Sequence, residues 1–214
     1  SGGCTSFELF RRWVVSDKKI LELEKATKQT ELQQLKKQIN PHFLFNMLNN
    51  ANILVKDAPD EASQILEKLD NLLRYQLNDS TRREVFLTAD IQFLTSFLEL
   101  EKVRRDHFEY TIFQEGNMEN ICIPPLLFIP FVENAVKHNL DSDNLSYVHL
   151  YFSVHNKQLT FRCENSKPRV PVKREGGIGL ANVKRRLDLL YESRYTLQIE
   201  DKETTYNVNL HLNS

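Results

Sequence analysis

One short stretch of the sequence gathers side chains that can meet a metal ion and phosphate groups. Asn134, Lys137 and His138 stand at positions i, i+3 and i+4, so a helix over this stretch would carry all three on one face. An amide oxygen can ligate Mg²⁺, and Lys and His side chains can donate to phosphate oxygens. Glu133 lies beside them and could accept a proton or orient water. Taken alone, the same pattern also fits a solvated helix face.

A glycine cluster, GGIGL at residues 176–180, stands at the start of a predicted helix. Glycines let the backbone approach phosphates closely, and the free N–H groups of a helix start attract anions. The spacing matches neither a Walker A loop nor a dinucleotide-binding fingerprint. By itself the cluster also fits an ordinary loop and helix cap.

A histidine near the N-terminal end has unusual neighbours. His42 follows Pro41, and it lies on a helical stripe that turns polar at Asn46 and Asn49. A lone histidine on a helix is usually structural, but a packed core would not select this polar stripe. His42 is therefore a candidate for chemistry.

In combination, these motifs resemble the LytS-type family of sensor histidine kinases, over most of residues 31–212. Four motifs occur in the family's order: a phosphoacceptor motif QINPHFLFN at 38–46, a third-helix pattern at 97–104, an N box between 123 and 138, and a G box between 177 and 191. The resemblance identifies His42 as the residue that accepts the phosphoryl group.

The resemblance implies an ATP-dependent kinase that phosphorylates its own His42 and passes the phosphate to the receiver domain of a response regulator. Its ATP-binding domain would have the Bergerat-type fold shared with gyrase and MutL, with ATP and Mg²⁺ as cofactors. Asn134 would ligate Mg²⁺, and Glu133 would act in catalysis with His42. The other residues expected to bind ATP are Lys137, His138, Glu164, Gly177, Gly179, Leu180 and Asn182.

Two departures from the family pattern concern the nucleotide. The adenine-contacting Asp-x-Gly-x-Gly motif of the superfamily is replaced at the corresponding strand end by ENS at residues 164–166, with Glu164 in the place of the aspartate. The lid that follows, at about 167–175, is short. A degenerate kinase that dimerises and relays a signal without ATP chemistry is therefore the alternative function. A Bergerat-type ATPase is a third reading, against which the motif around His42 argues.

Hydrophobic spacing predicts the elements that position the acceptor histidine. Residues 7–57 are predicted as one long helix with heptad spacing, which Pro41 should kink. A second helix is predicted over 60–79, with Pro59 in its first turn. An antiparallel hairpin with broad apolar stripes favours a four-helix bundle, so we expect a homodimer.

From Thr88 onward, short alternating segments and helical patterns take turns, which predicts an α+β sandwich with one sheet and helices on one face. Thr88 is expected to cap a third helix over 88–106. Strands are predicted at 108–113, 147–154, 158–163, 196–200 and 205–212, and helices at 125–139 and 179–191.

These patterns divide the chain into three predicted parts. Residues 1–30 are expected to be a cloning scar and a juxtamembrane linker helix, residues 31–80 the dimerisation and histidine phosphotransfer domain, and residues 84–214 the ATP-binding catalytic domain. The resemblance also implies a membrane sensor domain upstream of them.

The composition restricts the partners, the metal sites and the cellular location that are to be expected for the chain. A net charge of −1 gives no general attraction to nucleic acid, so we expect no nucleic-acid partner. The three cysteines, an odd number without CxxC spacing, indicate neither a disulfide framework nor a zinc site. Since no run reaches the ~20 apolar residues of a membrane helix, we expect the fragment itself to be soluble. The family resemblance implies that it is the cytoplasmic portion of a bacterial inner-membrane protein.

Overall fold

The computed structural model describes residues 41–139, 145–156, 158–168 and 178–213. All of them belong to one compact unit that spans residues 39–214. The predicted first helix falls on described residues only from Pro41 onward, so its earlier part and its kink stay predictions. No helix within the described residues is long and apolar enough to cross a membrane.

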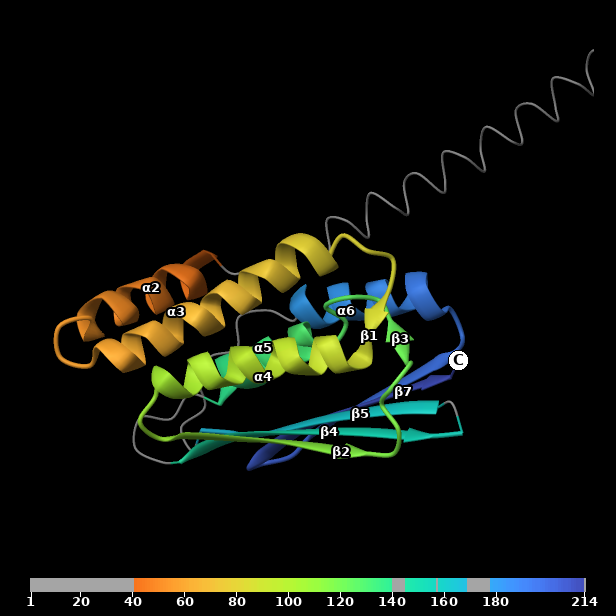
Figure 1. Cartoon of the computed structure of the whole chain (residues 1–214). Helices are drawn as coiled ribbons and strands as arrows, with labels where there is room; N and C mark the ends of the chain where they lie inside the picture. The colour runs from red at the N-terminus through yellow and green to blue at the C-terminus, as the bar shows by residue number, and fades with distance from the viewer. Residues whose placement is uncertain (1–40, 140–144, 157, 169–177, 214) are drawn as a thin grey trace, which may run out of the picture. The chain divides into compact units, whose positions relative to one another are not determined.

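Two helices form a hairpin before the sheet begins (Figure 1): α2 covers Pro41–Leu54 and α3 covers Pro59–Arg74. Pro59 lies in the first turn of α3 together with two acidic side chains that complement the helix dipole, as predicted. The helix then widens into a π-helix, η1, over Tyr75–Asp79. The predicted end of the second helix at residue 79 is therefore confirmed, although its last turn is not α-helical.

A pair of two-residue strands that the sequence did not predict fixes the start of the third helix. β1 (Val85–Phe86) pairs antiparallel with β3 (Cys122–Ile123), and α4 (Leu87–Val103) follows β1 directly. The backbone N–H of Leu87 donates to the carbonyl of Ile121 at 2.8 Å. The prediction that Thr88 caps this helix is wrong, because the cap position is Phe86, which makes no side-chain cap.

The main sheet has five strands in the order β2-β4-β5-β7-β6, with β2 and β4 parallel and the other neighbours antiparallel. The strands are β2 (Phe108–Glu115), β4 (Ser146–His155), β5 (Gln158–Ser166), β6 (Tyr195–Asp201) and β7 (Thr205–Asn213). All five predicted strands are present, and each is longer than predicted.

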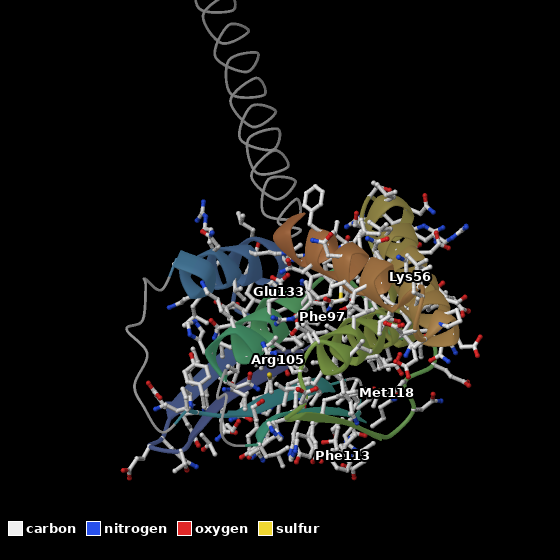
Figure 2. The ribbon with its side chains drawn as sticks, turned by 90° about the vertical axis from the view of Figure 1, so that its left-hand side faces the viewer. Lys56, Phe97, Arg105, Phe113, Met118 and Glu133 are labelled. Atoms are coloured by element: carbon white, nitrogen blue, oxygen red, sulfur yellow. The ribbon has the colours of Figure 1, made fainter. Side chains whose placement is uncertain are left out.

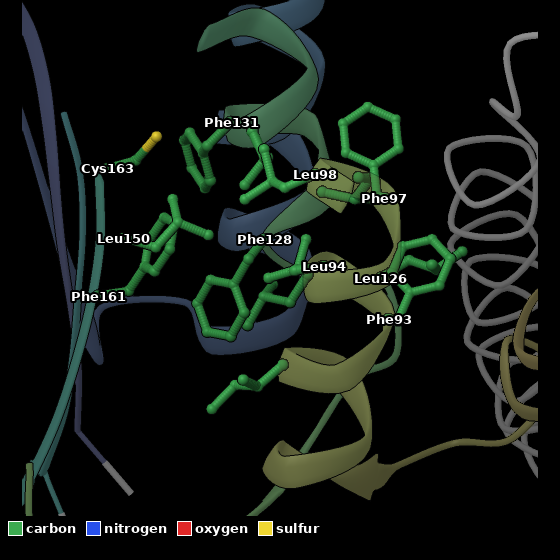
Figure 3. Packing of buried hydrophobic residues seen from close by; sticks show 14 of the residues in the cluster. Phe93, Leu94, Phe97, Leu98, Leu126, Phe128, Phe131, Leu150, Phe161 and Cys163 are labelled. Atoms are coloured by element: carbon green, nitrogen blue, oxygen red, sulfur yellow. The ribbon is translucent and has the colours of Figure 1, made fainter. Parts of the chain in front are cut away.

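Helices cover one face of this sheet: α4, α5 (Ile129–His138) and α6 (Ile178–Tyr191) lie on the same side (Figure 1). Phe128 is fully buried between the layers, with its ring 4.5 Å from that of Phe161 and edge-on to Phe152 (Figure 3). The predicted α+β sandwich, one sheet with helices on one face, is confirmed.

The helix predicted from Pro125 begins four residues later, at Ile129. Leu126 has a φ of 56°, a left-handed conformation that a right-handed helix does not contain. Residues 124–128 therefore form a turn that leads into α5, and we call this segment the N-box turn.

Candidate functional site

The polar residues predicted to bind phosphate lie on the flank of α5 that faces away from the core. Glu133, Asn134 and His138 are half-buried and Lys137 is exposed. The intervening apolar residues of the helix are buried against the sheet: Phe131, Val132, Ala135 and Val136. The predicted sharing of one helix face is confirmed, because the core takes the opposite face.

Glu133 has an altered acidity. Burial and, to a smaller extent, the negative charge of Glu101 on α4 together raise the pKa of its carboxyl group to about 7. Glu101 is itself buried and pairs with Arg104 at 2.6 Å and with Arg105 at 3.2 Å. A carboxyl group with a pKa near neutrality is suited to accept a proton at physiological pH.

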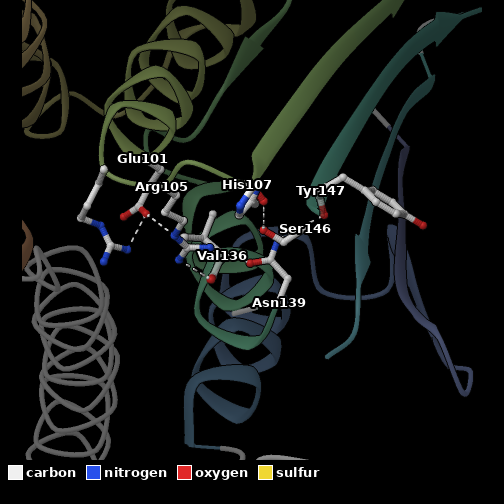
Figure 4. Close-up of polar contacts among 8 residues, drawn as sticks. Glu101, Arg105, His107, Val136, Asn139, Ser146 and Tyr147 are labelled. Atoms are coloured by element: carbon white, nitrogen blue, oxygen red, sulfur yellow. Dashed lines mark hydrogen bonds and ion pairs between the residues drawn. The ribbon is translucent and has the colours of Figure 1, made fainter. Parts of the chain in front are cut away.

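Arg105 fixes the end of α5 to the sheet (Figure 4). Its guanidinium group donates to the Val136 carbonyl at 2.8 Å and to Oδ1 of Asn139 at 2.9 Å. The amide group of Asn139, which is fully buried, donates in turn to the Tyr147 carbonyl at 3.2 Å. This network satisfies a helix-end carbonyl, so it fixes the last turn of α5, which carries Lys137 and His138. The sequence analysis missed both Arg105 and Asn139.

Glu164 does not lie where the sequence analysis placed it. Side chains of β5 alternate between the two faces of the sheet, and Phe161 and Cys163 point toward the helices (Figure 3). Glu164 therefore lies on the opposite, outer face, where it pairs with Arg162 and lies 3.5 Å from the Tyr147 hydroxyl. A side chain on that face points away from α5 and α6, which argues against the ATP contact predicted for Glu164.

Asn165 is the residue of this strand end that faces the helices, and it is buried. It follows Cys163 by two positions, so the period of two in the sequence was a sufficient signal to identify it. Ser166, which replaces the expected glycine, accepts a hydrogen bond from the Tyr147 backbone N–H at 3.0 Å. The strand end is thus held by a side chain where the family pattern has a flexible residue.

The last three residues of the glycine cluster, 178–180, form the start of α6 as predicted, whereas Gly176, Gly177 and the greater part of the lid lie outside the described residues. Gly179 is in the first turn of α6. Leu180 packs against the core, and Asn182, near the same end of the helix, is half-buried. α5 and α6 are in contact with each other, so the two predicted ATP-binding motifs lie on neighbouring helices.

Helix α2, which carries the predicted phosphoacceptor His42, contacts α4 through the residue that follows this histidine. His42 belongs to the first turn of α2, but its side chain lies outside the described part. The ring of Phe43, the next residue, lies 5.0 Å from the ring of Phe97 on α4. Figure 2 labels Phe97, Arg105 and Glu133 among the helices, whereas Phe113 lies on the far side of the sheet.

The described residues contain no group of three His, Cys, Asp or Glu side chains that could hold a metal ion by itself. A Mg²⁺ ion at this site would therefore depend on the Asn134 amide oxygen together with ligands from a nucleotide. Mg²⁺ characteristically binds in this way, through few protein ligands and several phosphate oxygens. The residues present fit such an ion.

Comparison with known proteins points to one family. The histidine kinase family model matches residues 30–108. Sensor protein LytS of Staphylococcus haemolyticus is 30% identical over 205 residues, which cover 89% of this chain and 35% of that protein. Sensor histidine kinase YpdA of Escherichia coli is 31% identical over 119 residues, which cover 56% of this chain and 21% of that protein.

A further relative is the sensor histidine kinase/phosphatase LytS of Staphylococcus aureus, 32% identical over 115 residues that cover 53% of this chain and 20% of that protein. The chain thus spans about a third or less of the length of these curated relatives. The family match includes the motif around His42, and the similarity to LytS of Staphylococcus haemolyticus covers most of the chain. Together these comparisons support a LytS-type histidine kinase.

Proposed function

We propose that this chain is the kinase core of a two-component sensor, which phosphorylates His42 with ATP and passes the phosphoryl group to the receiver domain of a response regulator. The observation that supports this most is the polar flank of α5, where Glu133, with a pKa of about 7, stands beside Asn134. A candidate Mg²⁺ ligand, Asn134, and a candidate proton acceptor, Glu133, are thus neighbours on one helix. The same chain carries the phosphoacceptor motif around His42.

The nucleotide site proposed here lies between the polar flank of α5 and the start of α6. Asn134 would hold Mg²⁺, which neutralises charge on the phosphates when bound, and Lys137 and His138 would donate to phosphate oxygens. On α6, the backbone at Gly177 and Gly179, together with Leu180 and Asn182, would complete the site. We propose Asn165 for the adenine contact in place of Glu164.

The proposed phosphorylation of His42 forms a nitrogen–phosphorus bond as the bond from the γ-phosphorus to its bridging oxygen breaks and ADP leaves. The attacking ring nitrogen must be unprotonated, and the other ring nitrogen carries a hydrogen. Positive charge develops on the ring, so a carboxylate that accepts this second N–H stabilises the product. No Asp or Glu occurs between Glu31 and Asp57. We assign this role to Glu133.

Incubation with γ-labelled ATP tests the proposal. A label that is lost in acid and kept in base identifies phosphohistidine, and it should be absent from the His42→Gln variant while ATP binding is retained. Free phosphate without labelled protein would favour the ATPase. Neither product would favour the degenerate signalling module. That alternative has lost one support, because the departure at Glu164 concerns a residue of the outer face.

We also propose that the hairpin forms a homodimer. Several large apolar side chains of α2, α3 and the adjoining segments are exposed: Phe45, Leu48, Ile53, Val55, Leu66 and Leu77. An exposed apolar patch of this kind is typical of an interface. Light scattering should show a dimer, and Ile53→Glu should shift the protein to a monomer. A wild-type monomer at high concentration would argue against the proposal.

The division into a linker at 1–30, a phosphotransfer domain at 31–80 and an ATP-binding domain at 84–214 also remains part of the proposal. So does the placement of a membrane sensor domain upstream. Binding of a receiver domain to the hairpin, measured with purified response regulators, tests the partner.

A further inference from the structure

A buried carboxylate outside the polar flank of α5 has contacts to several elements at once. Asp90, in the first turn of α4, is fully buried. One of its oxygens accepts a hydrogen bond from the Tyr75 hydroxyl at 2.6 Å and another from the Leu126 backbone N–H at 3.0 Å. Burying a charged carboxylate is unfavourable unless it is well paired. The position of Asp90 is therefore not explained by the packing of α4 alone.

A buried arginine holds the other side of the same turn. Arg186 of α6 is 4% exposed and donates hydrogen bonds to the carbonyls of Leu126 and Pro125. Its positive charge also attracts Asp90. The backbone N–H of Leu126 is thus bonded to Asp90 of α4, and its carbonyl is bonded to Arg186 of α6.

The N-box turn needs this support because its backbone is strained. A leucine with a φ of 56° occupies a conformation that side chains with a Cβ rarely adopt. Such a conformation persists only where the surroundings enforce it. The turn leads through the fully buried Phe128 into α5, so its geometry sets where α5 begins relative to α6.

Tyr75 connects this arrangement to the hairpin. It is the first residue of the π-helix η1, whose wider turn is closed by a hydrogen bond from the Ser80 N–H to the Tyr75 carbonyl at 3.0 Å. Its ring stacks on Phe93 of α4 at 4.8 Å. π-Helical turns within helices frequently lie at functional sites. Here the turn aims a hydroxyl at Asp90.

We propose that Tyr75, Asp90 and Arg186 are positioning residues for the kinase reaction. Asp90 and Arg186 fix the position of the start of α5 relative to α6. The hydrogen bond from Tyr75 makes this position depend on the conformation of the hairpin. The inference rests on the proposed function, since α5 and α6 matter because they would hold ATP. A change in the hairpin that withdraws the Tyr75 hydroxyl would loosen the N-box turn and slow phosphorylation.

The test compares Tyr75→Phe with Tyr195→Phe. The control also removes a tyrosine–carboxylate hydrogen bond of 2.6 Å, made to Asp188 of α6, but on the exposed surface. In Tyr75→Phe, hydrogen exchange over residues 124–132 should accelerate about fivefold or more. The rate of His42 labelling at saturating ATP should fall about tenfold while the Kd for ATP changes less than about twofold. Hydrogen exchange over 124–132, the labelling rate and the Kd for ATP should all stay unchanged in Tyr195→Phe.

A conservative variant separates positioning from simple stability. Asp90→Asn keeps an oxygen in place for Tyr75 and Leu126, so it should retain slow exchange over 124–132, whereas Asp90→Ala should lose it. Unchanged exchange in Tyr75→Phe, or faster exchange with an unchanged labelling rate, would overturn the inference. If the wild type shows no labelling, the proposed function fails, and the exchange measurement alone decides whether the three residues position the turn.

Discussion

The two faces of the sheet hold their arginine–glutamate pairs in different ways. On the helix side, Arg105 and Glu101 are 10% and 5% exposed, and Arg105 also binds α5 through Val136 and Asn139. On the outer face, Arg162 and Glu164 are 45% and 19% exposed and belong to the same strand. Both pairs join residues that are close in the sequence, four and two positions apart, but Arg105 also contacts Val136 and Asn139, which are 31 and 34 positions away. The sheet face, rather than the residue type, therefore decides which polar groups can act on a ligand.

The largest difference between the faces is expected for nucleotide binding. Asn134→Asp places an anion where phosphates and Mg²⁺ would meet, so it should weaken Mg²⁺-dependent ATP binding by about 100-fold or more. Asn209→Asp, a matched change in β7 opposite Arg162 on the outer face, should leave affinity unchanged. Calorimetry measures both. Equal affinity in the wild type and Asn134→Asp would remove Asn134 from the site.

The next largest effect concerns the carboxylate itself. Glu133→Gln should slow His42 labelling by about 10- to 100-fold and change ATP affinity much less, because the amide cannot stabilise the developing positive charge. The matched change Glu164→Gln on the outer face should have no effect on labelling. A large effect of Glu164→Gln would mean that the outer face takes part in the reaction.

The pH dependence of labelling sharpens this comparison. An ordinary histidine loses its proton near about pH 6.5, so the rate should rise about tenfold from pH 5.5 to 7.5 on that account. Glu133 acts as its anion, and its pKa of about 7 lies above the ordinary value, so its active fraction also increases with pH. The wild-type rate should therefore rise more steeply than that of Glu133→Gln. Single-turnover labelling at saturating ATP measures this, and parallel profiles would contradict the assigned role.

The two arginines, Arg105 and Arg162, should contribute unequally to the stability of the fold. Arg105→Gln leaves buried groups of Glu101 and Asn139 without their partner, so it should lower the free energy of unfolding by about 3 kcal/mol. Arg162→Gln removes a partly exposed pair and should cost about 1 kcal/mol or less. Urea denaturation of both variants checks this. Equal losses would show that the outer pair is as important for the fold as the inner one.

The smallest effect is expected from Asp90 and depends on pH. Burial raises the pKa of Asp90 to about 6 in the folded chain, above its unfolded value, so the folded state binds the proton more tightly. The stability that this gives is present below about pH 4 and is lost as pH rises through 6. As pH falls from 7 to 4, the free energy of unfolding of the wild type should thus increase by about 1–3 kcal/mol relative to that of Asp90→Asn. Urea denaturation at both pH values measures this difference, and its absence would contradict the assigned burial.

Alternation of apolar residues predicted all five main strands, because successive side chains of a strand face opposite sides of the sheet, as the burial of every second residue over most of β4 and β5 shows. The same period would have separated Asn165 from Glu164, so that error came from matching letters of a motif without testing the face. The start of α5 was misplaced because Leu126 adopts an unusual backbone conformation that local sequence does not reveal. β1 and β3 are too short to show a period.

The roles of Asp90 and Arg186 could not be predicted for a different reason. In the sequence nothing distinguishes Asp90, and Arg186 stands only as one residue of the G-box pattern, with no indication of its contacts. Their burial arises only when α4, α6 and the N-box turn come together, and the turn lies 36 positions from Asp90 and 60 from Arg186. By contrast, Asn134, Lys137 and His138 were found because three and four positions along one helix are enough to bring them together.

The two strand cysteines give the molecule a selective chemical label. Cys163 of β5 is buried, and burial raises the pKa of its thiol to about 12, so it contains almost no thiolate at neutral pH and resists alkylation. Cys122 of β3 is exposed and lies two residues before the N-box turn. With Cys4 replaced by serine, a maleimide fluorophore would attach at Cys122. The protein therefore already carries an attachment point from which an optical signal can follow the turn in real time.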